Sequence, residues 1–162
     1  MLKTSPDHPN VIVFPPAILA TTVVLGCMLQ WALPLGVLAT LSQAGRVPIG
    51  CAFIVAGVSL AVAGRRMLKS LGTNVSPLQP TTALATGGVY GWTRNPLYSG
   101  GTLVMLGIAL IFAVDWLALL IVPSLLILHF GVVSREEQYL EEKFGGAYRE
   151  YKMSVSRYGI GI

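Results

Sequence analysis

The sequence predicts an all-α, polytopic integral membrane protein with about four transmembrane helices and a C-terminal amphipathic helix at the membrane surface. Hydrophobic residues make up 54% of the 162 residues and charged residues only 11%, against roughly 25% charged residues in soluble domains. The apolar residues form long uncharged runs, which must be helical because a bilayer offers no water to backbone groups. The basic residues gather on one side of these runs. A chain of this length predicts one domain, 1–162.

The first uncharged run, 9–45, is too long for one straight span and short for two. Pro15 and Pro16 suit the first turn of a helix. We expect one span over about 17–41, kinked or ended by Pro34. The alternative is a turn near 30–34, which would give five spans.

The remaining runs predict three more spans, over 47–69, 97–114 and 116–133. Each contains an uncharged stretch of 18 residues, near the ~20 that cross a bilayer. Asp115 alone separates the last two spans, which predicts a tight antiparallel hairpin, and we interpret it as structural. Cys27 and Cys51 fall inside spans and are interpreted as small buried hydrophobic residues. No metal site is expected.

The distribution of basic residues predicts the orientation of the chain. With four spans, only Arg46 lies on one side, whereas ten basic residues lie on the other: Lys3, Arg65, Arg66, Lys69, Arg94, Arg135, Lys143, Arg149, Lys152 and Arg157. The positive-inside rule then places both termini and the loop 70–95 in the cytoplasm. Anionic membrane lipids account for the net charge of +4, and no nucleic-acid motif is present.

Two cytoplasmic segments carry most of the polar chemistry. The loop 70–95 is rich in Gly, Pro, Thr and Asn, and it exceeds the ~12–15 residues beyond which unstructured loops are usually functional or disordered. After the last span, 134–153 predicts an amphipathic interfacial helix, bent at Gly145 and Gly146. Ser134 and Glu137 have the spacing of a capping box. The alternative is that the last span continues unbroken as a helix into water.

The segment GVYGWTRNPLYSGGT, 88–102, leads directly into the third span. Its composition alone is typical of an aromatic belt with a snorkelling arginine, Arg94. The acidic pair Glu136 and Glu137, at the cytoplasmic end of the last span, offers this arginine a partner. The two segments together therefore favour a functional site over a belt.

The two patterns resemble a known family. G-x-Y-x-x-x-R-N-P-x-Y-x-G, followed by E-E-x-x-L-x-x-x-F-G-x-x-Y-x-x-Y-x-x-x-V-x-R, is similar to the isoprenylcysteine carboxyl methyltransferases. The N-P-L-Y-S-G-G-T segment and the Glu pair are similar to phospholipid N-methyltransferases of the same superfamily. The resemblance covers about 72–157 and implies an integral membrane enzyme that uses S-adenosylmethionine. The chain departs from the family pattern in two places. Asn95 stands where many members have His, and Arg157 is not followed by the Trp and Pro that often occur there.

The resemblance also implies site residues. Arg94 and Tyr98 would be catalytic, and the cofactor site would comprise Tyr90, Arg94, Asn95, Pro96, Tyr98, Glu136 and Glu137. The C-terminal lid would comprise Tyr148, Tyr151 and Arg157. His129, inside the last span, is either a further cofactor-binding residue or a hydrogen-bonded histidine that faces the bundle.

The predicted function is S-adenosylmethionine-dependent methyl transfer to a lipophilic acceptor, a carboxylate, thiol or amine, at the cytoplasmic face. Methyl transfer from a sulfonium is an in-line displacement that depends mainly on positioning, so the absence of a nucleophilic triad from the sequence fits it. The lipophilic or lipid substrate would arrive from the bilayer. Two alternatives remain: an NADPH-dependent membrane reductase of the sterol-reductase type, and a non-enzymatic membrane scaffold.

Overall fold

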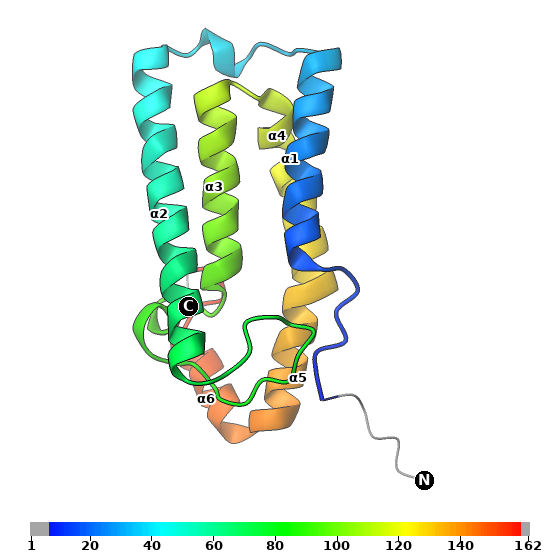
Figure 1. Cartoon of the computed structure of the whole chain (residues 1–162), viewed down its shortest axis with the longest axis vertical. Coiled ribbons are helices and arrows are strands. Elements are labelled where there is room, and N and C mark those ends of the chain that lie inside the picture. Colours follow the sequence, from blue (N-terminus) through cyan, green and yellow to red (C-terminus); the bar gives the residue numbers. More distant parts are fainter. Residues whose placement is uncertain (1–6, 160–162) are drawn as a thin grey trace.

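The computed structural model describes residues 7–159. Its helices are α1 Pro15–Ala32, α2 Gln43–Ser70, α3 Pro96–Phe112, α4 Asp115–Leu128, α5 Ser134–Phe144 and α6 Gly146–Ser154. The chain runs up α1, down α2, up α3 and down α4, and the loop 71–95, α5 and α6 lie at the lower end (Figure 1). Three helical stretches, α1, α2 and 115–144, are long and apolar enough to cross a membrane, and α3 is a shorter apolar helix. The all-α polytopic prediction is confirmed.

The first span is shorter than the expected 17–41, because α1 ends at Ala32. Pro34 accounts for this, since a proline disfavours helical backbone in the preceding residue, and Leu33 has left the helix with φ −140° and ψ 69°. Residues 33–42 contain only the 3₁₀ turn η1, Leu38–Thr40, and no additional span. Pro15 and Pro16 begin α1 as predicted.

The later helices match the expected spans with shifted ends. Helix α2 begins at Gln43 rather than at 47, and the hairpin between α3 and α4 turns at Ala113, in the left-handed region at φ 52°. Cys27 and Cys51 are exposed on the outer surfaces of their helices, so their predicted burial is wrong. These surfaces would face lipid, where an apolar thiol needs no protein contact.

Helices α2 and α3 pack backbone against backbone. Gly50, Gly57 and Gly64 repeat every seven residues on α2 and are buried against α3. A Cβ on Gly57 would lie 2.5 Å from the carbonyl oxygen of Gly100, and a Cβ on Gly107 would lie 2.6 Å from that of Gly50. Small residues permit this close approach. The resulting van der Waals contacts drive the association of helices in lipid, where no hydrophobic effect acts between them.

Asp115 fastens the upper loop, as its structural interpretation predicted. Its carboxylate, 4% exposed, accepts hydrogen bonds from the backbone N–H groups of Gly36 and Leu38 at 2.9 and 2.7 Å. The side chain of Gln30 donates a third bond at 3.4 Å. These bonds satisfy loop donors that would otherwise lie unpaired at the bilayer edge.

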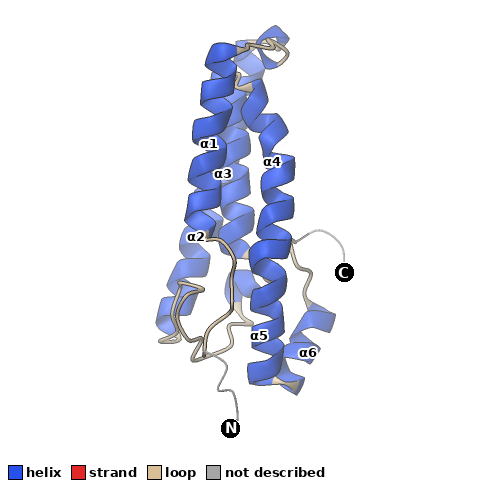
Figure 2. Ribbon diagram, turned by 90° about the vertical axis from the view of Figure 1, so that its right-hand side faces the viewer, coloured by secondary structure: helices blue, strands red, loops and turns tan. Residues whose placement is uncertain are grey.

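A single helical rod runs from α4 through a π-helical turn, η3 His129–Val133, into α5 (Figure 2). Its 30 residues extend about 45 Å, more than the ~30 Å hydrocarbon core. Since α5 has six charged residues, including Glu136 and Glu137, it lies beyond the hydrocarbon. Ser134 makes no side-chain cap, so the continuous-helix alternative holds and the capping box is wrong. The bend predicted at Gly145 and Gly146 divides the expected helix 134–153 into α5 and α6, and Gly145 has φ +56°.

Candidate functional site

The π-helical turn sets the direction of the acidic pair. The N–H of Ser134 donates to the carbonyl of His129, five residues earlier, so the turn holds one residue more than an α-helical turn. One added residue rotates everything that follows by about 100° relative to a continuous α-helix. Val132 and Val133 are fully buried, and α5 therefore leaves the turn with Glu136 and Glu137 facing the end of α3.

Glu137 is held by two arginines. The guanidinium of Arg157 donates to both of its carboxylate oxygens, at 3.0 and 2.6 Å, and Arg94 lies 3.2 Å from Oε1. Glu137 is 6% exposed, and an unpaired buried carboxylate would be very costly. The hydrogen bond to Glu137 raises the pKa of Arg157. Glu137 thus has its charge compensated within the protein.

Arg94 keeps two donors free. Its side chain is 9% exposed, and its Nε and Nη1 are buried without a hydrogen-bond partner among residues 7–159. A buried unsatisfied donor of a charged group costs on the order of 1–3 kcal/mol or more, so this is a costly arrangement for a purely structural arginine. These two donors lie on different edges of the planar guanidinium, so each can serve a separate acceptor group of a ligand.

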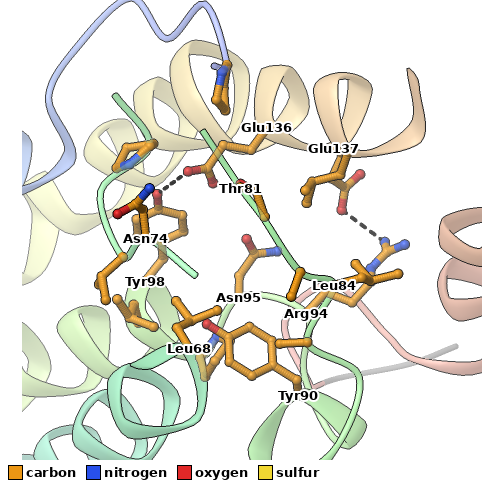
Figure 3. Close-up of a pocket in the computed structure, with 18 of the residues that line it drawn as sticks. Leu68, Asn74, Thr81, Leu84, Tyr90, Arg94, Asn95, Tyr98, Glu136 and Glu137 are labelled. Carbon is orange, nitrogen blue, oxygen red and sulfur yellow. Dashed lines mark hydrogen bonds and ion pairs between the residues drawn. The ribbon is translucent and has the colours of Figure 1, made fainter. Parts of the chain in front are cut away.

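Glu136 has a different environment. Its Oε1 accepts a hydrogen bond from the hydroxyl of Tyr98 at 2.8 Å, and no Lys, Arg or His within the described range pairs with it. Burial raises the pKa of Glu136 from 4.5 to about 7; the Tyr98 hydrogen bond opposes this rise, and the charge of Glu137 adds to it. Figure 3 shows Glu136 pointing toward Tyr98 and Glu137 toward Arg94. The adjacent carboxylates are therefore chemically distinct.

The C-terminal segment 155–159 is hydrogen-bonded to the arginine motif at 93–95. The backbone N–H of Arg94 donates to Ser156, and the side chains of Thr93 and Asn95 both donate to the carbonyl of Arg157. The Tyr151 hydroxyl donates to the carbonyl of Tyr90 at 2.7 Å. Burial raises the pKa of Tyr90, Tyr148 and Tyr151, which keeps these phenols neutral.

These groups surround one cavity, with an empty volume of about 810 Å³ that includes the open solvent at its mouth. Seven of the eight predicted cofactor-site residues line it: Tyr90, Arg94, Asn95, Pro96, Tyr98, Glu136 and Glu137. All of these except Pro96 are labelled in Figure 3. Of the three predicted lid residues, Tyr148 and Tyr151 line it too, whereas Arg157 does not and instead binds Glu137. His129 does not; its Nδ1 lies 2.9 Å from the Tyr158 hydroxyl, which matches the hydrogen-bonded alternative.

Sequence reasoning missed the N-terminal segment 7–14. Pro9 lines the cavity, and Ile12 donates its N–H to the carbonyl of Gly131 in the π-helical turn at 3.0 Å. The Tyr139 hydroxyl of α5 contacts Asp7 at 3.0 Å and accepts the N–H of Thr81 at 3.1 Å. This hydroxyl therefore joins the N-terminal segment to the loop 71–95. Nothing in the local pattern of 7–14 signals such a role.

An apolar groove opens beside the cavity, between α1 and α2 and across α3. Val23, Val58, Val104 and Met105 are among its lining residues. The two hollows share five lining residues, Val75, Ser76, Pro77, Leu97 and Tyr98. Tyr98, with its bond to Glu136, thus lies where a polar cavity meets an apolar path along the helices.

The fold and the site define a class: a helical integral membrane protein with a polar cavity at the end of its bundle. Phospholipid methyltransferase is the family whose sequence model matches this chain, over residues 46–147. The chain belongs to this family, which makes it a membrane methyltransferase of the superfamily that its motifs resemble. No curated protein and no solved structure matches it.

Proposed function

We propose that the protein transfers the methyl group of S-adenosylmethionine to a lipophilic acceptor at the cytoplasmic membrane face. The observation that carries this proposal is Arg94, nine-tenths buried, which has two donors without a partner among residues 7–159 and lines the same cavity as Glu136. The cofactor carries a carboxylate and two cationic groups, so the unpaired donors of Arg94 and the uncompensated carboxylate of Glu136 fit its two kinds of charge. Aromatic faces, here Tyr90 and Tyr98, add favourable contacts for a cation.

The side chains of this chain then have separate tasks. When bound, S-adenosylmethionine supplies an electrophilic methyl group for in-line displacement. Arg94 holds an anionic group through one of its two unpaired donors, whereas Glu136 and Tyr98 line the part nearest the groove. Glu137 positions Arg94 and, through Arg157, the C-terminal segment. Asn95 holds the same segment through its hydrogen bond to the Arg157 carbonyl. It therefore positions the C-terminal segment in addition to lining the cavity.

The acceptor would reach the site from the bilayer along the groove between α1 and α2. Its walls are apolar, and it ends at Tyr98, a residue that both hollows share. A lipophilic tail could remain in the groove while its head enters the polar cavity. The excess of basic residues at this end supports a cytoplasmic site, where S-adenosylmethionine is available.

Isothermal titration of the purified protein with S-adenosylhomocysteine tests cofactor binding. Arg94→Lys keeps a cation beside Glu137 but removes the free guanidinium donors. Hydrogen bonds to charged groups are worth ~1.5–3 kcal/mol, so affinity should fall about 10- to 100-fold. Arg149→Lys on the exposed face of α6 is the matched control and should bind like the wild type.

The same titration separates the alternative functions. A reductase would bind NADPH in preference to S-adenosylhomocysteine, and a scaffold would bind neither. Absence of heat with S-adenosylhomocysteine at high protein concentration, with a folded protein, would refute the proposal.

A further inference from the structure

Among the carboxylates of the site, only Glu136 is free to exchange a proton with a ligand. Glu137 is bound by Arg157 at 3.0 and 2.6 Å and by Arg94 at 3.2 Å. Glu136 uses Oε1 for the Tyr98 hydroxyl, and its Oε2 has no hydrogen-bond partner in the described part of the chain. The groups that face it are the phenols of Tyr98 on α3 and Tyr90 in the 3₁₀ turn η2, Gly88–Gly91, with Glu137 beside it on α5.

The location of Glu136 is as specific as its bonding. Its partner Tyr98 lines both the polar cavity and the apolar groove. The Tyr98 hydroxyl fixes Oε1 at 2.8 Å, which leaves Oε2 to interact with a group at this junction. An acceptor whose tail lies in the groove would present its reacting head here.

We propose that Glu136 removes a proton from the acceptor, an inference that rests on the methyltransferase function proposed above. The acceptor therefore reaches the site as a protonated nucleophile such as an ammonium. The N–H bond breaks and its proton passes to Oε2 of Glu136. The electron pair left on nitrogen forms the new N–C bond to the methyl carbon. The carbon–sulfur bond breaks, and its pair stays on sulfur as a neutral thioether. Glu136 then returns its proton to water at the open mouth of the cavity.

The electrostatics of the site favour this class of acceptor. A carboxylate without a cationic partner attracts an ammonium and repels a carboxylate acceptor. Burial raises the pKa of Glu136 to about 7, and burial lowers that of an ammonium, so the two approach each other at the junction. A general base is most effective when its pKa lies near the working pH. An acceptor that arrives as an anion would need no base.

The test compares a long-chain primary amine with a fatty acid, each in phosphatidylcholine vesicles containing the protein. Glu136→Gln should reduce methyl transfer to the amine about 100-fold or more and remove the rise of the rate with pH near neutrality. Glu136→Asp should restore part of the rate. Glu142→Gln, the same change on an exposed position of α5, is the matched control.

A second readout is independent of turnover. In infrared difference spectra of the wild type with S-adenosylhomocysteine bound, a protonated carboxyl band should titrate near neutral pH, and Glu136→Gln should lack it. Failure to methylate the amine, a pH profile unchanged by Glu136→Gln, or a band that survives in the variant would each overturn the inference. If the wild type did not bind S-adenosylhomocysteine, the proposed function itself would fail first.

Discussion

Arg157 binds both carboxylate oxygens of Glu137, at 3.0 and 2.6 Å, and this pair fastens the C-terminal segment to α5. The same segment accepts hydrogen bonds from Thr93, Arg94 and Asn95 through its carbonyl groups. The end of the chain therefore holds the arginine motif in place, and the pair couples three parts of the molecule that are distant in sequence.

We expect Arg157→Lys to loosen this segment, because an ammonium cannot reproduce the bidentate contact. The lost interaction is partly exposed on the arginine side, so the effect should be about 1 kcal/mol, or roughly fivefold weaker binding of S-adenosylhomocysteine. Hydrogen exchange should show reduced protection over 155–159. Arg149→Lys serves as control, and equal protection in both variants would contradict the coupling.

The contact of Gly57 with Gly100 predicts a sharp penalty for one methyl group. Gly57→Ala would place Cβ 2.5 Å from a backbone carbonyl oxygen that cannot move aside, and overpacking of this kind costs about 1–3 kcal/mol. Gly45→Ala adds the same atom to the same helix with nothing within 4 Å. Thermal unfolding in detergent should show a lower midpoint for Gly57→Ala only. Equal midpoints would mean that α2 and α3 lie farther apart.

The contacts of Tyr139 predict that its hydroxyl holds the N-terminal segment more firmly than the neighbouring ion pair does. Tyr139→Phe removes the contacts to Asp7 and Thr81, so residues 7–14 and 74–85 should become more sensitive to limited proteolysis. Lys143→Met keeps the Tyr139 hydroxyl but removes an exposed ion pair with Asp7 and an exposed hydrogen bond to that hydroxyl, and exposed pairs contribute about 0–1 kcal/mol. This second variant should cleave almost like the wild type. Similar sensitivity in both variants would show that the ion pair, not the hydroxyl, fastens the segment.

The pKa of Glu136 predicts a pH dependence of stability. Because burial raises it from 4.5 to about 7, the folded protein binds this proton more tightly than the unfolded chain. The contribution of Glu136 to stability is therefore fully present below about pH 4.5 and is lost as the pH rises through about 7. The difference in unfolding midpoint between the wild type and Glu136→Gln, measured from pH 5 to 8, should follow this loss. A difference independent of pH would contradict the raised pKa.

The sequence predicts the helical bundle and the convergence of Arg94 with Glu137 because both follow from patterns along the chain. Uncharged runs specify helices in a bilayer, and the motif that contains Arg94 resembles that of a family. The end of α1 was harder to predict, because residues 33–42 are as apolar as a span. What decides it is Pro34 together with Asp115, which lies far along the chain and accepts the N–H groups of Gly36 and Leu38.

The distinct environments of Glu136 and Glu137 could not be predicted. They depend on the π-helical turn, and His129–Val133 has no sequence feature that announces an extra residue. The role of the segment 7–14 was hidden for a different reason: its partners on α5, Arg135 and Tyr139, lie more than 120 positions away. Local patterns contain no information about such contacts.

The five-residue turn between α4 and α5 also makes the alignment of the site unusually sensitive to chain length. Deleting one position there, such as Gly131, could leave every helix intact and every charged side chain present. Yet α5 would swing by roughly a quarter turn, and its acidic pair would be aimed past α3. The enzyme would thus lose its activity through a rotation of α5 alone, with no residue of the site replaced.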